Sequence, residues 1–80
     1  MIKKKELYLK AVAEKKYNED ELNLLFKTLV PTDSKVDIYQ IKASIIYLSN
    51  SIEEVRDLVV DANKDCWQVM NWAQVKSDRT

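Results

Sequence analysis

The chain has 80 residues, 13 basic and 13 acidic side chains, 46% apolar residues, and neither glycine nor histidine. This length predicts a single domain near the lower limit for a self-sufficient core, a size often reinforced by close helix packing or oligomerisation. Without glycine the chain is poorly equipped for tight hairpin turns, so we expect an all-α fold. The zero net charge argues against a free-standing nucleic-acid binder, which usually carries a basic excess.

The same composition argues against catalysis and membrane insertion. Lack of histidine removes the commonest catalytic base and metal ligand, and lack of glycine removes phosphate-binding loop motifs. Glu53, Asp57 and Asp61 follow one another at four-residue steps, but surface acids at this spacing are usually only solvated. We therefore expect no enzyme activity, cofactor or metal ion. No apolar run is long enough to span a membrane, and the lone Cys66 is interpreted as core filler in a cytoplasmic protein.

A first helix is predicted at residues 3–16, where Leu9, Val12 and Ala13 form an apolar stripe. The segment carries six lysines against two glutamates. The plainer interpretation is a solvated helix face. The alternative is a contact for an acidic protein, an anionic lipid surface or phosphate. The candidate contacts for such an anionic partner are Lys3, Lys4, Lys5 and Lys10.

A second helix is predicted at residues 19–30. Asn18 is a favourable N-cap, and the three acidic residues that follow it suit the positive end of a helix dipole. Pro31 cannot continue a helix. The polar connector that follows contains Ser34, a candidate cap for the third helix.

From Ile38 to Ala73, apolar residues recur at alternating steps of three and four, as in a helix packed lengthwise against others. Here we predict a third helix at residues 35–48 and a fourth at residues 52–76, the latter disturbed at Asn63. The break between them rests on serine and asparagine, which are weak helix formers. The alternative is one continuous long helix, because the phase passes unbroken through this point. The prediction is a single-domain bundle of about four helices.

The third and fourth helices carry more apolar surface than one seam can bury. Trp67 and Trp72 lie off the seam on opposite flanks of the last helix. This helix is therefore either the central helix of the bundle or the carrier of a protein–protein contact, where tryptophan, tyrosine and methionine are enriched. The candidate partner or oligomer interface consists of Tyr39, Ile46, Tyr47, Val60, Trp67, Met70 and Trp72.

These observations favour a non-enzymatic intracellular interaction protein, such as a small regulator, inhibitor or adaptor, that forms a homodimer through the Ile38–Ala73 region. The alternative is an accessory protein of nucleic acid or anionic membrane surfaces that uses the lysines of the first helix. DNA reading by a helix-turn-helix is not expected, since the second helix would present Glu53 and Glu54 to phosphate. The richness in lysine, isoleucine, asparagine and tyrosine is compatible with an AT-rich genome, including those of phages and plasmids.

Overall fold

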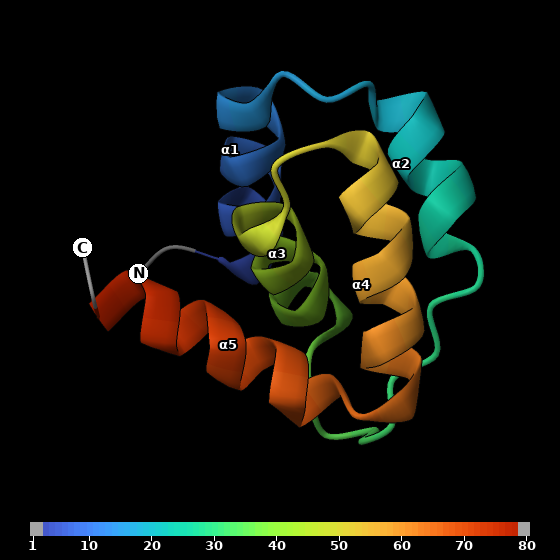
Figure 1. The fold of residues 1–80 in the computed structure, drawn as a ribbon, viewed down its shortest axis with the longest axis vertical. Helices are drawn as coiled ribbons and strands as arrows, with labels where there is room; N and C mark the ends of the chain where they lie inside the picture. Colours follow the sequence, from blue (N-terminus) through green and yellow to red (C-terminus); the bar gives the residue numbers. More distant parts are fainter. Residues whose placement is uncertain (1–2, 79–80) are drawn as a thin grey trace.

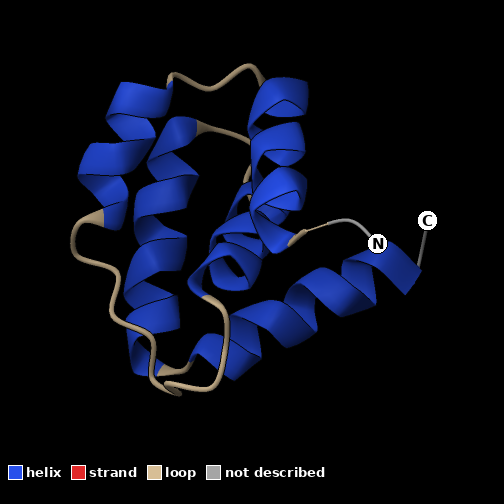
Figure 2. Cartoon of the chain, turned by 180° about the vertical axis from the view of Figure 1, so that it is seen from behind, coloured by secondary structure: helices blue, strands red, loops and turns tan. Residues whose placement is uncertain are grey.

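The computed structural model describes residues 3–78, and all regular elements in this part of the chain are α-helices (Figures 1 and 2). The helices are α1 (Lys4–Lys15), α2 (Glu19–Phe26), α3 (Ile38–Leu48), α4 (Ile52–Lys64) and α5 (Cys66–Asp78). The all-α prediction is confirmed, but the predicted fourth helix is two helices. The Cα radius of gyration is 11.5 Å, close to the value of about 12 Å expected for a compact chain of this length.

Helix α3 is the centre of the fold. It packs against α1, α4 and α5, and α2 packs against α4 (Figure 1). Ile41, Ile45 and Ile46 of α3 are fully buried. The central position that the sequence analysis considered for the last helix therefore belongs to α3. Helix α5 crosses one end of the other helices and leaves its outer side open to solvent (Figure 1).

The predicted break between α3 and α4 is confirmed, and its capping residues act as expected. The Ser51 hydroxyl accepts the backbone N–H of Glu54 at 3.3 Å, and the Glu54 carboxylate accepts the N–H of Asn50 at 2.8 Å. This is close to a reciprocal capping box. At the start of α2, the Asn18 side chain likewise accepts two backbone N–H groups. Local capping chemistry thus outweighs the unbroken heptad phase.

Two lysines stabilise the carboxyl end of α3, where unpaired carbonyl groups attract cations. The Lys15 ammonium donates to the Ser49 carbonyl at 2.8 Å, and the Lys76 ammonium donates to the Tyr47 carbonyl at 3.0 Å. The fully buried Ser49 side chain is also satisfied, since its hydroxyl lies 2.9 Å from the Tyr17 hydroxyl. The turn between α3 and α4, which is the first corner of this part of the chain, is therefore held by lysines of both neighbouring helices, α1 and α5.

A second corner separates α4 from α5 at Asp65, where the sequence analysis expected only a disturbance at Asn63. The backbone of Asp65 is extended, and its carboxylate accepts the N–H groups of Trp67 and Gln68 at 3.1 and 3.4 Å. Asp65 is therefore the N-cap of α5. Its spacing to Gln68 is a helix-start signature that the sequence contained and our interpretation missed.

The loop between α2 and α3 is longer than predicted, because α2 ends at Phe26 and α3 begins only at Ile38. The N-cap of α3 is Asp37 rather than Ser34, since the Asp37 carboxylate accepts the N–H of Tyr39 at 2.8 Å. Helix α2 already has its inward apolar residues within two turns. The remaining residues up to the predicted end instead form contacts with the α4–α5 corner.

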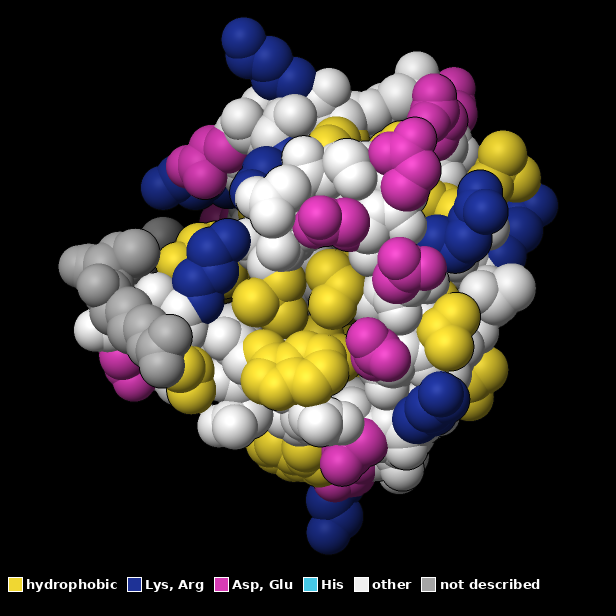
Figure 3. Space-filling view, in the orientation of Figure 1, with side chains coloured by type: hydrophobic (Ala, Val, Ile, Leu, Met, Phe, Trp, Pro, Cys, Tyr) yellow, Lys and Arg dark blue, Asp and Glu magenta, His cyan; other side chains and the backbone are white. Residues whose placement is uncertain are grey.

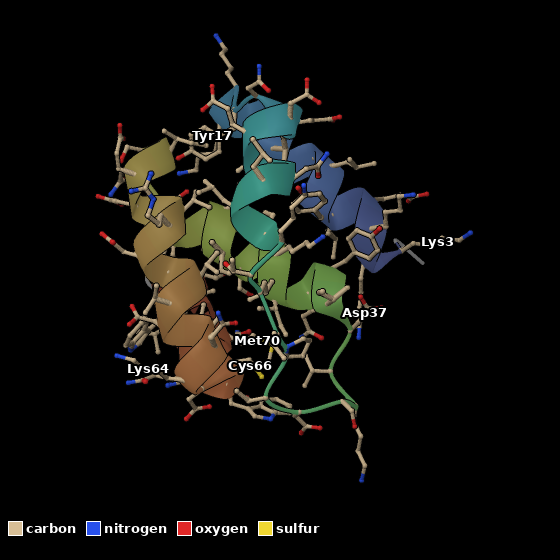
Figure 4. The ribbon with its side chains drawn as sticks, turned by 90° about the vertical axis from the view of Figure 1, so that its right-hand side faces the viewer. Lys3, Tyr17, Asp37, Lys64, Cys66 and Met70 are labelled. Carbon is tan, nitrogen blue, oxygen red and sulfur yellow. The ribbon has the colours of Figure 1, made fainter. Side chains whose placement is uncertain are left out.

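Side chains of that corner hold the loop in place. The Asn63 amide accepts the N–H of Val30 at 2.7 Å and donates to the carbonyl of Thr28 at 2.8 Å. The Thr32 hydroxyl accepts the N–H of Cys66 at 3.2 Å and lies 3.1 Å from the Cys66 sulfur. Figure 4 shows this sulfur beside the loop. The loop is thus fixed by contacts between residues more than 30 positions apart.

The heptad seam is the core of one chain. Its members on α3, α4 and α5 are buried or half-buried. Each helix uses the three-four spacing for its own inward face. The apolar spacing therefore continues unbroken, although the chain changes direction twice. In this structure the seam therefore packs against the chain's own helices.

Candidate functional site

An open groove of about 400 Å³ lies between α1 and α5, with α3 forming its floor. Each of the three helices contributes one alanine and one larger apolar side chain. These six residues are Leu7, Ala11, Ala43, Tyr47, Met70 and Ala73. The alanines leave space that larger side chains would have filled, because α1 and α5 both pack on α3. Concave, mainly apolar hollows with a few polar groups are the usual form of binding sites. We call this hollow the α1–α5 groove.

The α1 side of this groove is basic. Lys4 lines it directly, and Lys3 and Lys10 lie one helical turn on either side of Leu7. Figure 4 shows Lys3 extending from the body of the molecule into solvent. The fourth predicted lysine, Lys5, is on a different flank, with its ammonium 6.0 Å from the Tyr39 ring. Of the four predicted lysines, Lys4 therefore lines the groove, whereas Lys3 and Lys10 lie outside its lining on the same helix.

The α5 side of the groove is polar and less basic. Gln74 and Ser77 line it, and the Gln74 amide donates to the Asp78 carboxylate at 3.1 Å. Lys76 of α5 lies against the ring of the groove residue Tyr47, and the charged side chain that lines the groove is Lys4, on the α1 side. A ligand with acidic groups would be drawn to that side, whereas its apolar side chains would contact the alanines.

The predicted interface residues are divided between the core and the surface. Ile46 and Met70 belong to the core, since they are 0% and 8% exposed. Tyr39 and Tyr47 are half-buried. Tyr47 forms part of the groove, and the Lys76 ammonium lies 4.9 Å from its ring centre. Of these residues, Tyr47 and the edge of Met70 are brought together in the groove.

Three other predicted residues are exposed outside the groove. Val60, Trp67 and Trp72 are 50%, 56% and 39% exposed. Trp67 continues the α5 row that includes Met70 by helical spacing. Its indole N–H donates to the Asp33 carboxylate at 3.1 Å. Hydrogen bonds from the Lys35 backbone and from this indole lower the pKa of Asp33.

An aromatic cluster around Lys42 was not foreseen. The Lys42 ammonium lies 5.2 to 5.7 Å from the ring centres of Tyr8, Phe26 and Tyr39. Such cation–π contacts stabilise a charge, but burial still lowers the pKa of this lysine. The three rings come from α1, α2 and α3, so no local sequence pattern could have indicated the cluster. The cluster is occupied by the protein's own side chain and forms part of the packing.

Between residues 3 and 78 no cluster of three histidine, cysteine or acidic residues is arranged to hold a metal ion. No helix in that part of the chain is both long and apolar enough to cross a membrane. The Cys66 thiol is buried in the core.

No family model matches the chain, and neither a curated protein nor a solved structure is significantly similar to it. The geometry of the groove is therefore the best guide to the function of this protein.

Proposed function

We propose that this protein is a non-enzymatic interaction module, and that the α1–α5 groove binds an apolar, acidic segment of a protein chain. The observation that carries the proposal is the groove itself, which is lined mainly by apolar side chains from three helices and by Lys4 on its α1 side. This combination matches helix-in-groove recognition, in which an amphipathic helix inserts its apolar face. Such binding suits a small intracellular regulator, inhibitor or adaptor.

The two parts of the site have different roles. Burying one leucine-sized side chain stabilises a complex by about 1.5 to 3 kcal/mol, so the apolar floor supplies most of the affinity. The lysines on the border are exposed, and exposed charges mainly set orientation and the association rate. The module should therefore discriminate between acidic and basic segments that present the same apolar face.

A nucleic-acid or membrane-surface role has less support. The lysines that made the first helix basic do not form one continuous surface: Lys15 is bonded to Ser49, and Lys5 lies beside Tyr39. Counterion-driven binding requires several cations that contact phosphate together. Binding assays with duplex DNA, RNA and anionic vesicles would support this function only if binding fell steeply as the salt concentration rose.

The proposal is tested with a fluorescent helical peptide that has leucines on one face and glutamates elsewhere. We expect fluorescence anisotropy to show binding to the wild type. The Ser44→Phe change fills the groove from its floor and should weaken binding at least about tenfold, or about 1.4 kcal/mol. Lys4→Glu should weaken binding of this peptide and favour a version with lysines in place of the glutamates.

Val60→Phe is the matched control, because it adds the same ring at an exposed site on α4. It should leave peptide binding unchanged. Circular dichroism and thermal unfolding show whether each variant is folded. The proposal is wrong if the wild type does not bind the peptide, or if a folded Ser44→Phe variant binds it as well as the wild type does.

A further inference from the structure

We infer that the segment bound by the α1–α5 groove is the acidic α2 surface of a second copy of this chain, so that copies associate head to tail. This inference rests on the proposed function, because it identifies a partner for the same groove. The chain carries both halves of the interaction, an apolar groove lined by a lysine and an acidic surface with an exposed leucine.

The acidic surface is centred on Leu24, which is 63% exposed. It borders a hollow of about 340 Å³ between α2 and α4, lined also by Glu21, Glu53 and one basic residue, Arg56. Asp20 lies one turn before Leu24 on α2. We call the set Asp20, Glu21, Leu24, Glu53 and Arg56, three acidic residues and one basic residue around a leucine, the Leu24 surface. Figure 3 shows that acidic side chains continue along the length of α4 beside it.

The Leu24 surface and the α1–α5 groove carry charges of opposite sign. One presents an exposed leucine beside Glu21 and Glu53, and the other presents a mainly apolar hollow that Lys4 lines. The chain as a whole has no net charge. Long-range repulsion between copies is therefore weak, a condition that promotes association.

The Leu24 surface cannot reach the groove of its own chain. Helix α2 packs against α4, whereas the groove lies between α1 and α5 over α3 (Figure 1). The contact must therefore join different surfaces of different copies. Such heterologous contacts form rings when the rotation closes and open chains when it does not.

The test is sedimentation velocity of the full chain over a range of protein concentrations at low and high salt. We expect the wild type to associate at low salt and to dissociate as salt screens the charges. Leu24→Ser and Ser44→Phe should each lower the association constant at least tenfold. Lys64→Glu changes a charge outside both surfaces and should have little effect.

Charge reversal gives the sharpest form of the test. The double variant Glu21→Lys with Glu53→Lys has two basic surfaces, and Lys4→Glu with Lys10→Glu has two acidic ones. Each should be monomeric alone, whereas an equimolar mixture should associate again. Recovery on mixing cannot come from misfolding, because two misfolded variants would not restore each other.

A wild type that stays monomeric at low salt overturns the inference, as does association that both double variants retain. Two outcomes separate it from the proposed function. If the monomeric wild type still binds the leucine–glutamate peptide, only the self-association is wrong. If it neither associates nor binds the peptide, the proposed function is wrong as well.

Discussion

Lys16 adopts a left-handed backbone conformation with φ of 59° at the end of α1. Its N–H donates to the Ala13 carbonyl, and the N–H of Tyr17 donates to the Val12 carbonyl, the pattern of a Schellman motif. Residues with a Cβ pay a steric cost in this region, and glycine does not. A chain without glycine therefore carries a small, localised strain at this residue.

We predict that Lys16→Gly raises the free energy of unfolding by about 1 kcal/mol, because it relieves this strain. Urea unfolding followed by circular dichroism measures the change. Lys27→Gly is the control, since Lys27 ends α2 with an ordinary helical φ of −58°. Glycine at that position should destabilise the protein through its backbone entropy. Equal effects of the two changes would contradict the argument.

The Asn63 side chain joins helix α4 to the loop between α2 and α3. Its amide pairs with the N–H of Val30 and the carbonyl of Thr28, and so replaces the helical hydrogen bonds that α2 gives up when it ends. Because the amide oxygen accepts one hydrogen bond and the amide nitrogen donates the other, both the orientation and the position of this side chain are fixed. This single side chain therefore links the loop to the α4–α5 corner.

We predict that Asn63→Ala lowers the free energy of unfolding by about 1 kcal/mol, because two hydrogen bonds in a largely exposed setting are lost. The Val30 amide should also exchange with solvent much faster, which hydrogen exchange monitored by NMR measures. Asn71→Ala, at an exposed site on α5, is the control. An unchanged exchange rate at Val30 in Asn63→Ala would show that the loop is held by other contacts.

Two groups in the aromatic cluster change the stability of the whole molecule at alkaline pH, and their effects are opposite. Burial, assisted by the charges of Glu19 and Tyr39, raises the pKa of Tyr8 above 10.0, whereas burial lowers the pKa of Lys42 below 10.5. The folded state keeps the Tyr8 proton to higher pH than the unfolded state does, so the stability that Tyr8 contributes is lost as pH rises. The folded state releases the Lys42 proton earlier, so this group adds stability as pH rises towards 10.5.

We predict that the stability of Tyr8→Phe falls less steeply above about pH 10 than that of the wild type, since it lacks the descending contribution. The stability of Lys42→Met should fall more steeply than that of the wild type just below about pH 10, since this variant lacks the contribution that rises with pH. Urea unfolding between about pH 8 and 11 measures both slopes. If the Tyr8→Phe profile matched that of the wild type, Tyr8 would not be the group responsible.

At the scale of the whole fold, the sequence alone predicted the all-α class, the bounds of α1 to within one residue, and the corner after α3. These features depend on local causes. Periodic apolar residues define an inward face, and Asn18 and Ser51 cap helices within three residues of themselves. The seam was also correctly assigned as a packing surface, although it packs within one chain.

Only the tertiary structure decided the rest, because the forces involved act between distant residues. The early end of α2 reflects bonds from Asn63, 33 and 35 positions away from its partners. The α4–α5 corner had a local signal at Asp65, but the continuing heptad phase obscured it. The α1–α5 groove depends on the meeting of Ala11, Ala43 and Ala73. Alanines with no mutual sequence pattern line one groove only when three helices bring them together.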